Sequence, residues 1–77
     1  MGQYKIVVGT TDRKEVARDH YNLVNKNDIN GDIRIYKTDK GELYSVEVGP
    51  YSQKKQMLQD LDKIKDLGVI NAFITGN

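Results

Sequence analysis

Four stretches of the chain show the alternation or the short apolar runs that are typical of β-strands. They are residues 4–8, 32–36, 43–48 and 69–75. All four are rich in β-branched or aromatic residues, and the first and third run directly into a glycine, Gly9 or Gly49. Pro50 follows at once and has no amide hydrogen for a sheet ladder, so we expect it to end the third strand.

The segment between the first two strands has the three- and four-residue spacing of an amphipathic helix. Its apolar stripe is made of Val16, Ala17, His20, Tyr21, Leu23 and Val24. Asp12 stands just before this stripe and Glu15 follows three residues later, a pair that predicts reciprocal capping of the helix start. We therefore expect one helix that buries one face.

A second helix is predicted between the third and fourth strands. Its stripe is made of Met57, Leu58, Leu61, Ile64 and Leu67. Ser52 is the candidate residue to cap its start, and Gly68 is placed to terminate it.

An internal repeat connects these elements. Residues 4–9, Tyr-Lys-Ile-Val-Val-Gly, recur as Tyr-Ser-Val-Glu-Val-Gly at residues 44–49. Each copy is followed by a helical pattern and a short strand, and the turn Asp39-Lys40-Gly41 joins the two halves. The order β-α-β-β-α-β predicts an α+β, ferredoxin-like fold: a four-stranded antiparallel sheet, in the order 4-1-3-2, with both helices on one face.

Strand alternation assigns each residue to one face of this sheet. The side covered by the helices should hold Tyr4, Ile6, Val8, Ile33, Ile35, Tyr44, Val46, Val48, Ile70, Ala72 and Ile74. The open side should hold Lys5, Val7, Arg34, Tyr36, Ser45, Glu47, Asn71 and Phe73. Two aromatics and a guanidinium among polar groups are unusual for a face that contacts only water.

Composition narrows the possible chemistry. Twelve Lys and Arg against eleven Asp and Glu give a formal net charge of +1, so strong electrostatic binding to nucleic acid or anionic lipid is not expected. The chain has no cysteine and a single histidine, His20, and residues 25–32 lack the bidentate glutamate of a calcium loop. We expect no catalytic residues, no metal and no cofactor, a packing role for His20, and no membrane-spanning segment, because no apolar run approaches ~20 residues.

The motif at residues 43–52 carries a resemblance to a known family. It reads Leu-Tyr-Ser-Val-Glu-Val-Gly-Pro-Tyr-Ser and, with the related opening at residues 4–10, resembles the SPOR domain. The resemblance covers residues 4–75. It implies a ferredoxin-like fold and binding to the glycan strands of bacterial peptidoglycan, especially strands stripped of stem peptides. This chain has Val7 where the family often has a glutamine, and Glu47 where the family often has a basic residue. These differences suggest a divergent member.

The resemblance also predicts the molecular context, since SPOR domains typically end cell-division, sporulation or wall-lytic proteins. We expect residues 1–77 to be a single SPOR-like domain from the C-terminal part of a larger protein. The attached catalytic domain would be a wall hydrolase such as an N-acetylmuramoyl-L-alanine amidase or an endolysin, acting outside the cytoplasm at the cell wall. The expected partner is peptidoglycan glycan, with no nucleic acid and no membrane.

The predicted site is the open face of the sheet. Its glycan-binding residues are Val7, Arg34, Tyr36, Ser45, Glu47, Asn71 and Phe73. Sugars present apolar C–H faces ringed by hydroxyls, so aromatic rings stack on them while polar groups fix their orientation. Tyr36 and Phe73 should carry most of the binding, one on each of the strands that flank the central pair.

Simpler roles for these residues stay open. Tyr36 and Phe73 could be ordinary surface aromatics covered by another domain or a second copy in an oligomerisation module. Arg34 and Glu47 could form an exposed cross-strand ion pair. The main functional rival is an RNA-recognition motif, which shares this topology and stacks bases on aromatics of its first and third strands. Against it, Glu42 occupies the first aromatic position of that motif, and Glu47 adds a second carboxylate.

Overall fold

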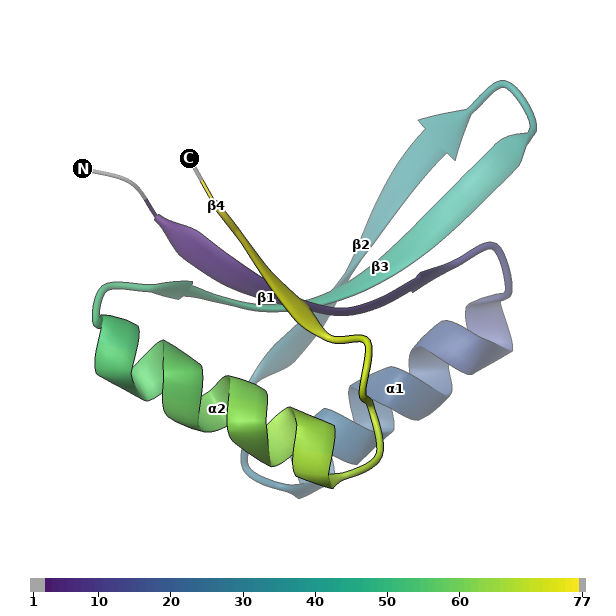
Figure 1. The fold of residues 1–77 in the computed structure, drawn as a ribbon. Helices are drawn as coiled ribbons and strands as arrows, with labels where there is room; N and C mark the ends of the chain where they lie inside the picture. Colours follow the sequence, from purple (N-terminus) through teal and green to yellow (C-terminus); the bar gives the residue numbers. More distant parts are fainter. Residues whose placement is uncertain (1–2, 77) are drawn as a thin grey trace.

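The computed structural model describes residues 3–76 and has the predicted order of elements. The elements are β1 (Tyr4–Thr11), α1 (Lys14–Lys26), β2 (Gly31–Thr38), β3 (Gly41–Tyr51), α2 (Lys54–Asp66) and β4 (Phe73–Gly76). The four strands form one antiparallel sheet in the order β2-β3-β1-β4, and both helices lie on the same side of it (Figure 1). The ferredoxin-like fold and the 4-1-3-2 strand order are thereby confirmed.

The core lies between the helices and the two central strands. Its buried apolar residues are Ile6, Val8, Ala17, Val24, Ile29, Val46, Val48, Met57, Ile64 and Ala72. All except Ile29 belong to the predicted inward rows or helical stripes. Ile29 joins the core because its backbone N–H donates to the Val24 carbonyl at 3.0 Å, which folds the loop after α1 back under the sheet.

Four residues expected to face inward are exposed: Tyr4, Ile33, Ile35 and Ile70. Ile33 pairs with the fully buried Val46, so it does lie on the helix side of the sheet. The far part of the β2–β3 hairpin projects beyond the helices, however, and nothing covers it there among residues 3–76 (Figure 1). Ile70 lies in a turn, because β4 begins only at Phe73 instead of residue 69.

A β-bulge interrupts the alternation of β1. Val7 pairs with Glu47, yet Gly9, two residues later, pairs with Val46, so Val8 is an extra residue on β1. Beyond the bulge the facing of β1 is reversed. Thr10 consequently pairs with Ser45 on the open side of the sheet, where simple alternation would have turned it inward.

A second register shift lets β3 continue through Pro50 to Tyr51, so the prediction that Pro50 ends the strand is wrong. Gly49 makes this possible. Its φ is +130°, and a Cβ there would lie 3.0 Å from the Tyr4 carbonyl oxygen and 3.2 Å from Lys5 Cα. Only glycine adopts this conformation and accepts so close an approach without strain.

The predicted helix starts are wrong, whereas the predicted end of α2 is confirmed. Arg13 and Gln53 occupy the two N-cap positions, and neither makes a side-chain capping bond. Thr11 Oγ1 instead accepts from the Arg13 N–H at 3.0 Å. Gly68 has a φ of +102° and its N–H donates to the Lys65 carbonyl at 3.0 Å, which is the left-handed ending expected of a terminating glycine.

The predicted loop at residues 25–32 is shorter in the structure, where it covers residues 27–30, and it is tied together by Asn25 near the end of α1. Its amide donates to the carbonyl oxygen of Gly31 and accepts from the N–H of the same residue, both at 3.3 Å. Residues 3–76 contain no cluster of His, Cys, Asp or Glu side chains that could hold a metal ion. Neither helix of this part of the chain is long and apolar enough to cross a membrane.

Candidate functional site

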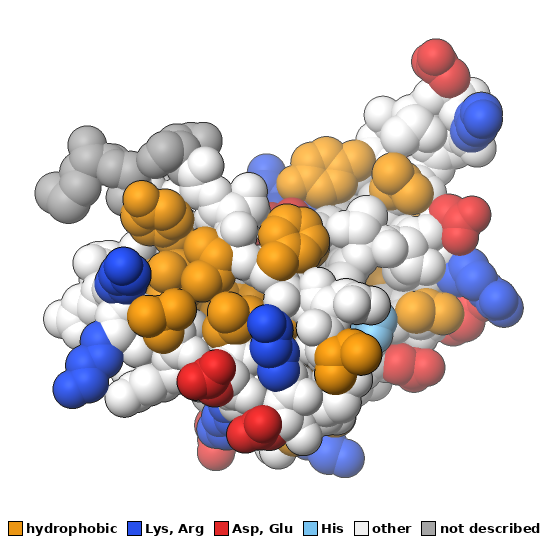
Figure 2. All heavy atoms as spheres, viewed as in Figure 1, with side chains coloured by type: hydrophobic (Ala, Val, Ile, Leu, Met, Phe, Trp, Pro, Cys, Tyr) orange, Lys and Arg blue, Asp and Glu red, His pale blue; other side chains and the backbone are white. Residues whose placement is uncertain are grey.

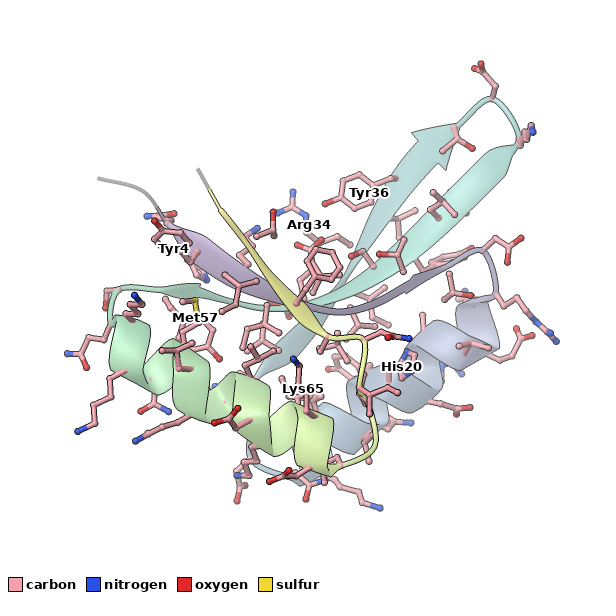
Figure 3. The ribbon with its side chains drawn as sticks, in the orientation of Figure 1. Tyr4, His20, Arg34, Tyr36, Met57 and Lys65 are labelled. Carbon is pink, nitrogen blue, oxygen red and sulfur yellow. The ribbon has the colours of Figure 1, made fainter. Side chains whose placement is uncertain are left out.

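Six of the seven predicted site residues lie on the face of the sheet that the helices leave open. Cross-strand pairing places Glu47, Val7 and Phe73 in one row across β3, β1 and β4. A neighbouring row holds Arg34 and Ser45. Figure 3 shows Arg34 and Tyr36 on the opposite side of the sheet from both helices. The structure therefore brings these six side chains onto one surface, termed here the open face.

Asn71 is the exception. It was expected on a strand, but it lies in the turn before β4 and is exposed there. The turn forms because the Ala72 N–H donates to the Val69 carbonyl at 3.4 Å, which keeps this segment away from β1. Asn71 lines a separate hollow together with Phe73.

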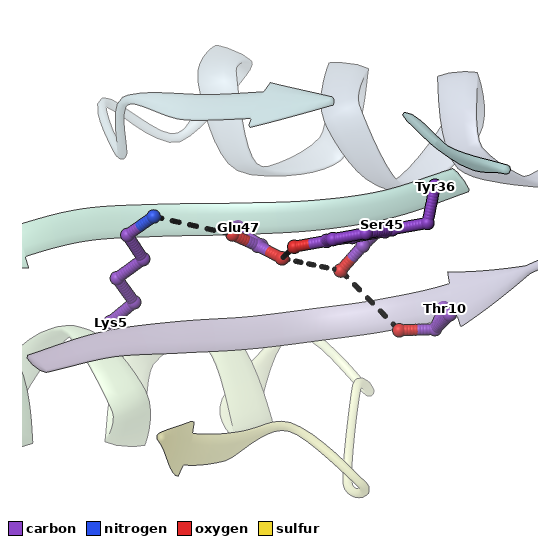
Figure 4. Close-up of polar contacts among 5 residues, drawn as sticks. All are labelled: Lys5, Thr10, Tyr36, Ser45 and Glu47. Carbon is purple, nitrogen blue, oxygen red and sulfur yellow. Dashed lines mark hydrogen bonds and ion pairs between the residues drawn. The ribbon is translucent and has the colours of Figure 1, made fainter. Parts of the chain in front are cut away.

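A polar network occupies the middle of the open face, with the Glu47 carboxylate at its centre (Figure 4). Glu47 Oε2 accepts from the hydroxyls of Ser45 at 2.9 Å and Tyr36 at 3.1 Å. Glu47 Oε1 lies 3.7 Å from Lys5 Nζ, and Thr10 donates to Ser45 at 3.4 Å. The Glu47 side chain is only 10% exposed, so these neighbours cover it almost completely.

This network holds the hydroxyl end of the Tyr36 side chain in place. The hydrogen bond to Glu47 raises the pKa of Tyr36 above its ordinary value of 10.0. At neutral pH the hydroxyl is protonated, as in any tyrosine, and it donates to the Glu47 carboxylate. One edge of the ring is held, while the side chain as a whole is 46% exposed and can contact a ligand.

Phe73 supplies the second exposed aromatic of the open face, at 54% exposure, on the opposite edge strand. Between the two aromatics, Val7 is 7% and Ser45 3% exposed. Val7 and Ser45 therefore form the covered floor of the face and support their neighbours, and little of their own surface is left for a ligand.

Arg34 is not paired with Glu47, so the alternative that these two residues form a cross-strand ion pair is wrong. Glu47 pairs with Lys5 instead, and no ion pair of Arg34 occurs within residues 3–76. Arg34 and Lys5 line a hollow of about 280 Å³ on the open face that ends at Pro50. Lys5, Tyr36 and Glu47 also line an adjoining hollow of about 310 Å³.

Sequence reasoning missed two members of the site, Lys5 and Thr10. Lys5 was assigned to the correct face, but its pairing with Glu47 depends on the register between β1 and β3. Thr10 reaches the open face only because of the bulge at Val8, and an insertion of one residue leaves no distinct pattern in a single sequence.

The arrangement provides the means to bind a ligand. His20 Nδ1 has no hydrogen-bond partner within residues 3–76, and the ring packs against Gly9 on the helix side of β1. The open face offers aromatic area, donors, an acceptor and cations over a shallow, extended surface.

Comparison with known proteins identifies similar chains. The family model described as SPOR domain matches residues 1–76. The fold is similar to the solution structure of the peptidoglycan binding domain of the B. subtilis cell wall lytic enzyme CwlC, with a TM-score of 0.73 at 23% identity over 100% of this chain and 91% of that one. It is also similar to the crystal structure of the RlpA SPOR domain from Pseudomonas aeruginosa, with a TM-score of 0.75 at 17% identity over 95% and 96% of the two chains. No curated protein matches the chain at a significant level.

Proposed function

This chain belongs to the SPOR domain family, and from that premise we propose that it is a non-catalytic module that binds the glycan strands of bacterial peptidoglycan. The ligand lies along the open face, across the strands. This proposal is supported by the similar fold of a domain described as peptidoglycan binding. The residues of the open face, rather than that likeness, decide how the sugars are held.

The observation that carries the proposal is the arrangement of two exposed aromatics around a fixed polar centre. Tyr36 and Phe73 stand on the two edge strands, with the Glu47 network between them. A glycan strand has apolar ring faces that stack on aromatics, and hydroxyls that exchange hydrogen bonds with polar groups. The guanidinium of Arg34, which has no ion pair within residues 3–76, can donate to sugar oxygens or to a carboxylate of the strand.

The polar groups of the open face argue against the rival ligand, single-stranded RNA. Glu47 places a carboxylate on the open face of β3, the strand that carries stacking aromatics in RNA-recognition motifs. The net charge of +1 provides little attraction for a phosphate backbone. The aromatics lie on the edge strands instead, where an extended sugar chain crosses the sheet from one ring to the other.

We further propose that the module directs a cell-wall-acting protein to its substrate. The attached catalytic domain is a wall hydrolase, most simply an amidase, and the whole protein works outside the cytoplasm. One structural neighbour is a domain of an enzyme described as cell wall lytic, which supports this context. Binding then raises the local concentration of the hydrolase on glycan, as expected for a linked pair of modules.

The test is co-sedimentation with purified peptidoglycan of the parent chain and of Tyr36→Ala, Phe73→Ala and Tyr21→Ala. Tyr21 is the matched control, an aromatic exposed on α1 on the other side of the sheet. Loss of a stacking ring is worth on the order of 1–3 kcal/mol, so each open-face variant should bind about tenfold more weakly.

Tyr21→Ala should bind as the parent does, and all variants should keep their urea midpoints close to that of the parent. If both open-face variants stay folded and bind like the parent, the ligand does not lie on this face. If the parent binds single-stranded RNA at low salt and does not bind peptidoglycan, the proposed function is wrong.

A further inference from the structure

A hollow of about 500 Å³ lies beside the open face, next to the start of β4. Val69, Ile70 and Phe73 give it apolar walls, and Thr10, Asn71 and His20 add polar groups. Ile70 is 73% exposed at its rim, the highest value among the large hydrophobic side chains of residues 3–76. Figure 2 shows the pale blue of the single histidine at the surface, next to orange hydrophobic side chains. A volume of this size lies within the usual range for small-molecule sites.

The hollow exists because β4 covers only part of the edge of β1. The two strands pair from Tyr4 to Val7, where β4 begins with Phe73. Beyond Val7, within residues 3–76, the same edge of β1 has no strand partner. This free edge borders the hollow at Gly9 and Thr10, and the outward backbone groups of a free sheet edge have no ladder partner.

His20 forms the inner wall of the hollow in a fixed orientation. Its ring lies so close to Gly9 that a Cβ on that residue would be 3.0 Å from both Cε1 and Nδ1. Nδ1 is buried and has no hydrogen-bond partner within residues 3–76. His20 lines the hollow, and its imidazole can donate or accept a hydrogen bond.

We infer that this hollow is a subsite for the N-acetyl group of one sugar in the glycan strand bound by the open face. The inference rests on the proposed function and specifies which part of the ligand is recognised here. An acetamido group carries a methyl, an N–H donor and a carbonyl acceptor. The hollow matches it with the apolar walls and with the side-chain groups of Asn71, His20 and Thr10.

The hollow and the open face form one continuous surface. Phe73 lines the hollow and also ends the row that begins at Glu47. Thr10 lines the hollow and donates to Ser45 on the open face. A strand that stacks on Tyr36 and Phe73 therefore continues past β4 into the hollow, where the next sugar places its acetamido group.

The experiment compares binding to peptide-free glycan strands before and after chemical de-N-acetylation. The proteins are the parent, Asn71→Ala, His20→Phe and Tyr36→Ala. Asn71 is exposed in a turn, so its truncation leaves the fold intact, and His20→Phe keeps an aromatic ring while removing both nitrogens. Tyr36→Ala is the control that weakens the open face alone.

We expect the parent to prefer intact strands by about tenfold, because acetamido hydrogen bonds are lost on the treated ones. Loss of that preference in Asn71→Ala or His20→Phe, while Tyr36→Ala binds more weakly but keeps it, supports the subsite. The inference is wrong if the parent binds both preparations equally. It is also wrong if both hollow variants keep the preference for intact strands, or if Tyr36→Ala loses that preference. In each of these cases the proposed function is not contradicted. If the parent binds neither preparation, the proposed function fails as well.

Discussion

Replacing Glu47 by alanine removes the centre of the polar network on the open face. Ser45, which is almost fully buried, loses the carboxylate that accepts its hydrogen bond at 2.9 Å. Tyr36 loses the partner that holds its hydroxyl, and Lys5 loses its counter-charge. One side chain therefore supports three others, and its removal should affect both stability and binding.

The magnitude follows from the exposure of each partner. The buried bond to Ser45 contributes about 1 kcal/mol. The bond to the half-exposed Tyr36 contributes about 0.5 kcal/mol, and the ion pair with the partly exposed Lys5 about the same. Glu47→Ala should therefore lower the free energy of unfolding by about 1–2 kcal/mol, since relief of burying the carboxylate offsets part of the sum. Glu47→Gln keeps an acceptor and should cost about half as much.

Urea unfolding measures this change, read as a lower midpoint at unchanged slope. Glu42→Ala is the matched control on the same strand, since Glu42 accepts one exposed bond from Tyr44 at 3.1 Å. It should shift the free energy of unfolding by no more than about 0.5 kcal/mol. In a double-mutant cycle, Glu47→Ala and Ser45→Ala should couple by about 1 kcal/mol. If Glu47→Ala is as stable as the parent, or the two changes are additive, the network does not stabilise the fold as reasoned here.

Three further predictions concern the fold. Ile64→Ala should lower the free energy of unfolding by about 2–5 kcal/mol in urea, because this α2 side chain is fully buried and leaves a cavity; a cost below about 1 kcal/mol would contradict its place in the core. Gly49→Ala should cost about 1–3 kcal/mol, because of the φ of +130° and the approach to the Tyr4 carbonyl, and a neutral effect would show that β3 relaxes freely there. Burial and the bond to Asp60 raise the pKa of Tyr51. The stabilisation from this group is full below about pH 10, where the unfolded tyrosine is protonated too, and is lost as the pH rises further. Thermal unfolding of Tyr51→Phe should accordingly depend less steeply on pH above 10 than that of the parent, and equal slopes would refute this assignment.

The pattern along the chain was sufficient for the architecture. Alternation with a period of two placed Ile6, Val46 and Val48 on one face, and all three are buried in the core. Three- and four-residue spacing placed Met57 and Ile64 on the buried side of α2. The two-residue period of a strand and the 3.6-residue period of a helix are local properties of the backbone. Because the apolar faces that these periods create must be buried, the strands and helices can pack together in only a few ways. The SPOR-like motifs, repeated forty residues apart, indicated the family in the same local way.

The candidate site was predictable only in part. Tyr36 and Phe73 were assigned to the open face, and both are exposed there. That assignment needed only the facing of each strand. Whether these residues bind glycan is a separate matter, which the variants above decide.

Contacts that depend on the register between distant strands were decided by the tertiary structure alone. The bulge at Val8 moves Thr10 to the open face, and the pairing of β1 with β3 brings Lys5 to Glu47. The late start of β4 at Phe73 leaves the hollow that Asn71 lines. A one-residue bulge changes which side chains meet beyond it, and it leaves no distinct pattern in a single sequence. The sequence by itself therefore determined the layers and their order, and long-range packing determined which polar groups share a surface.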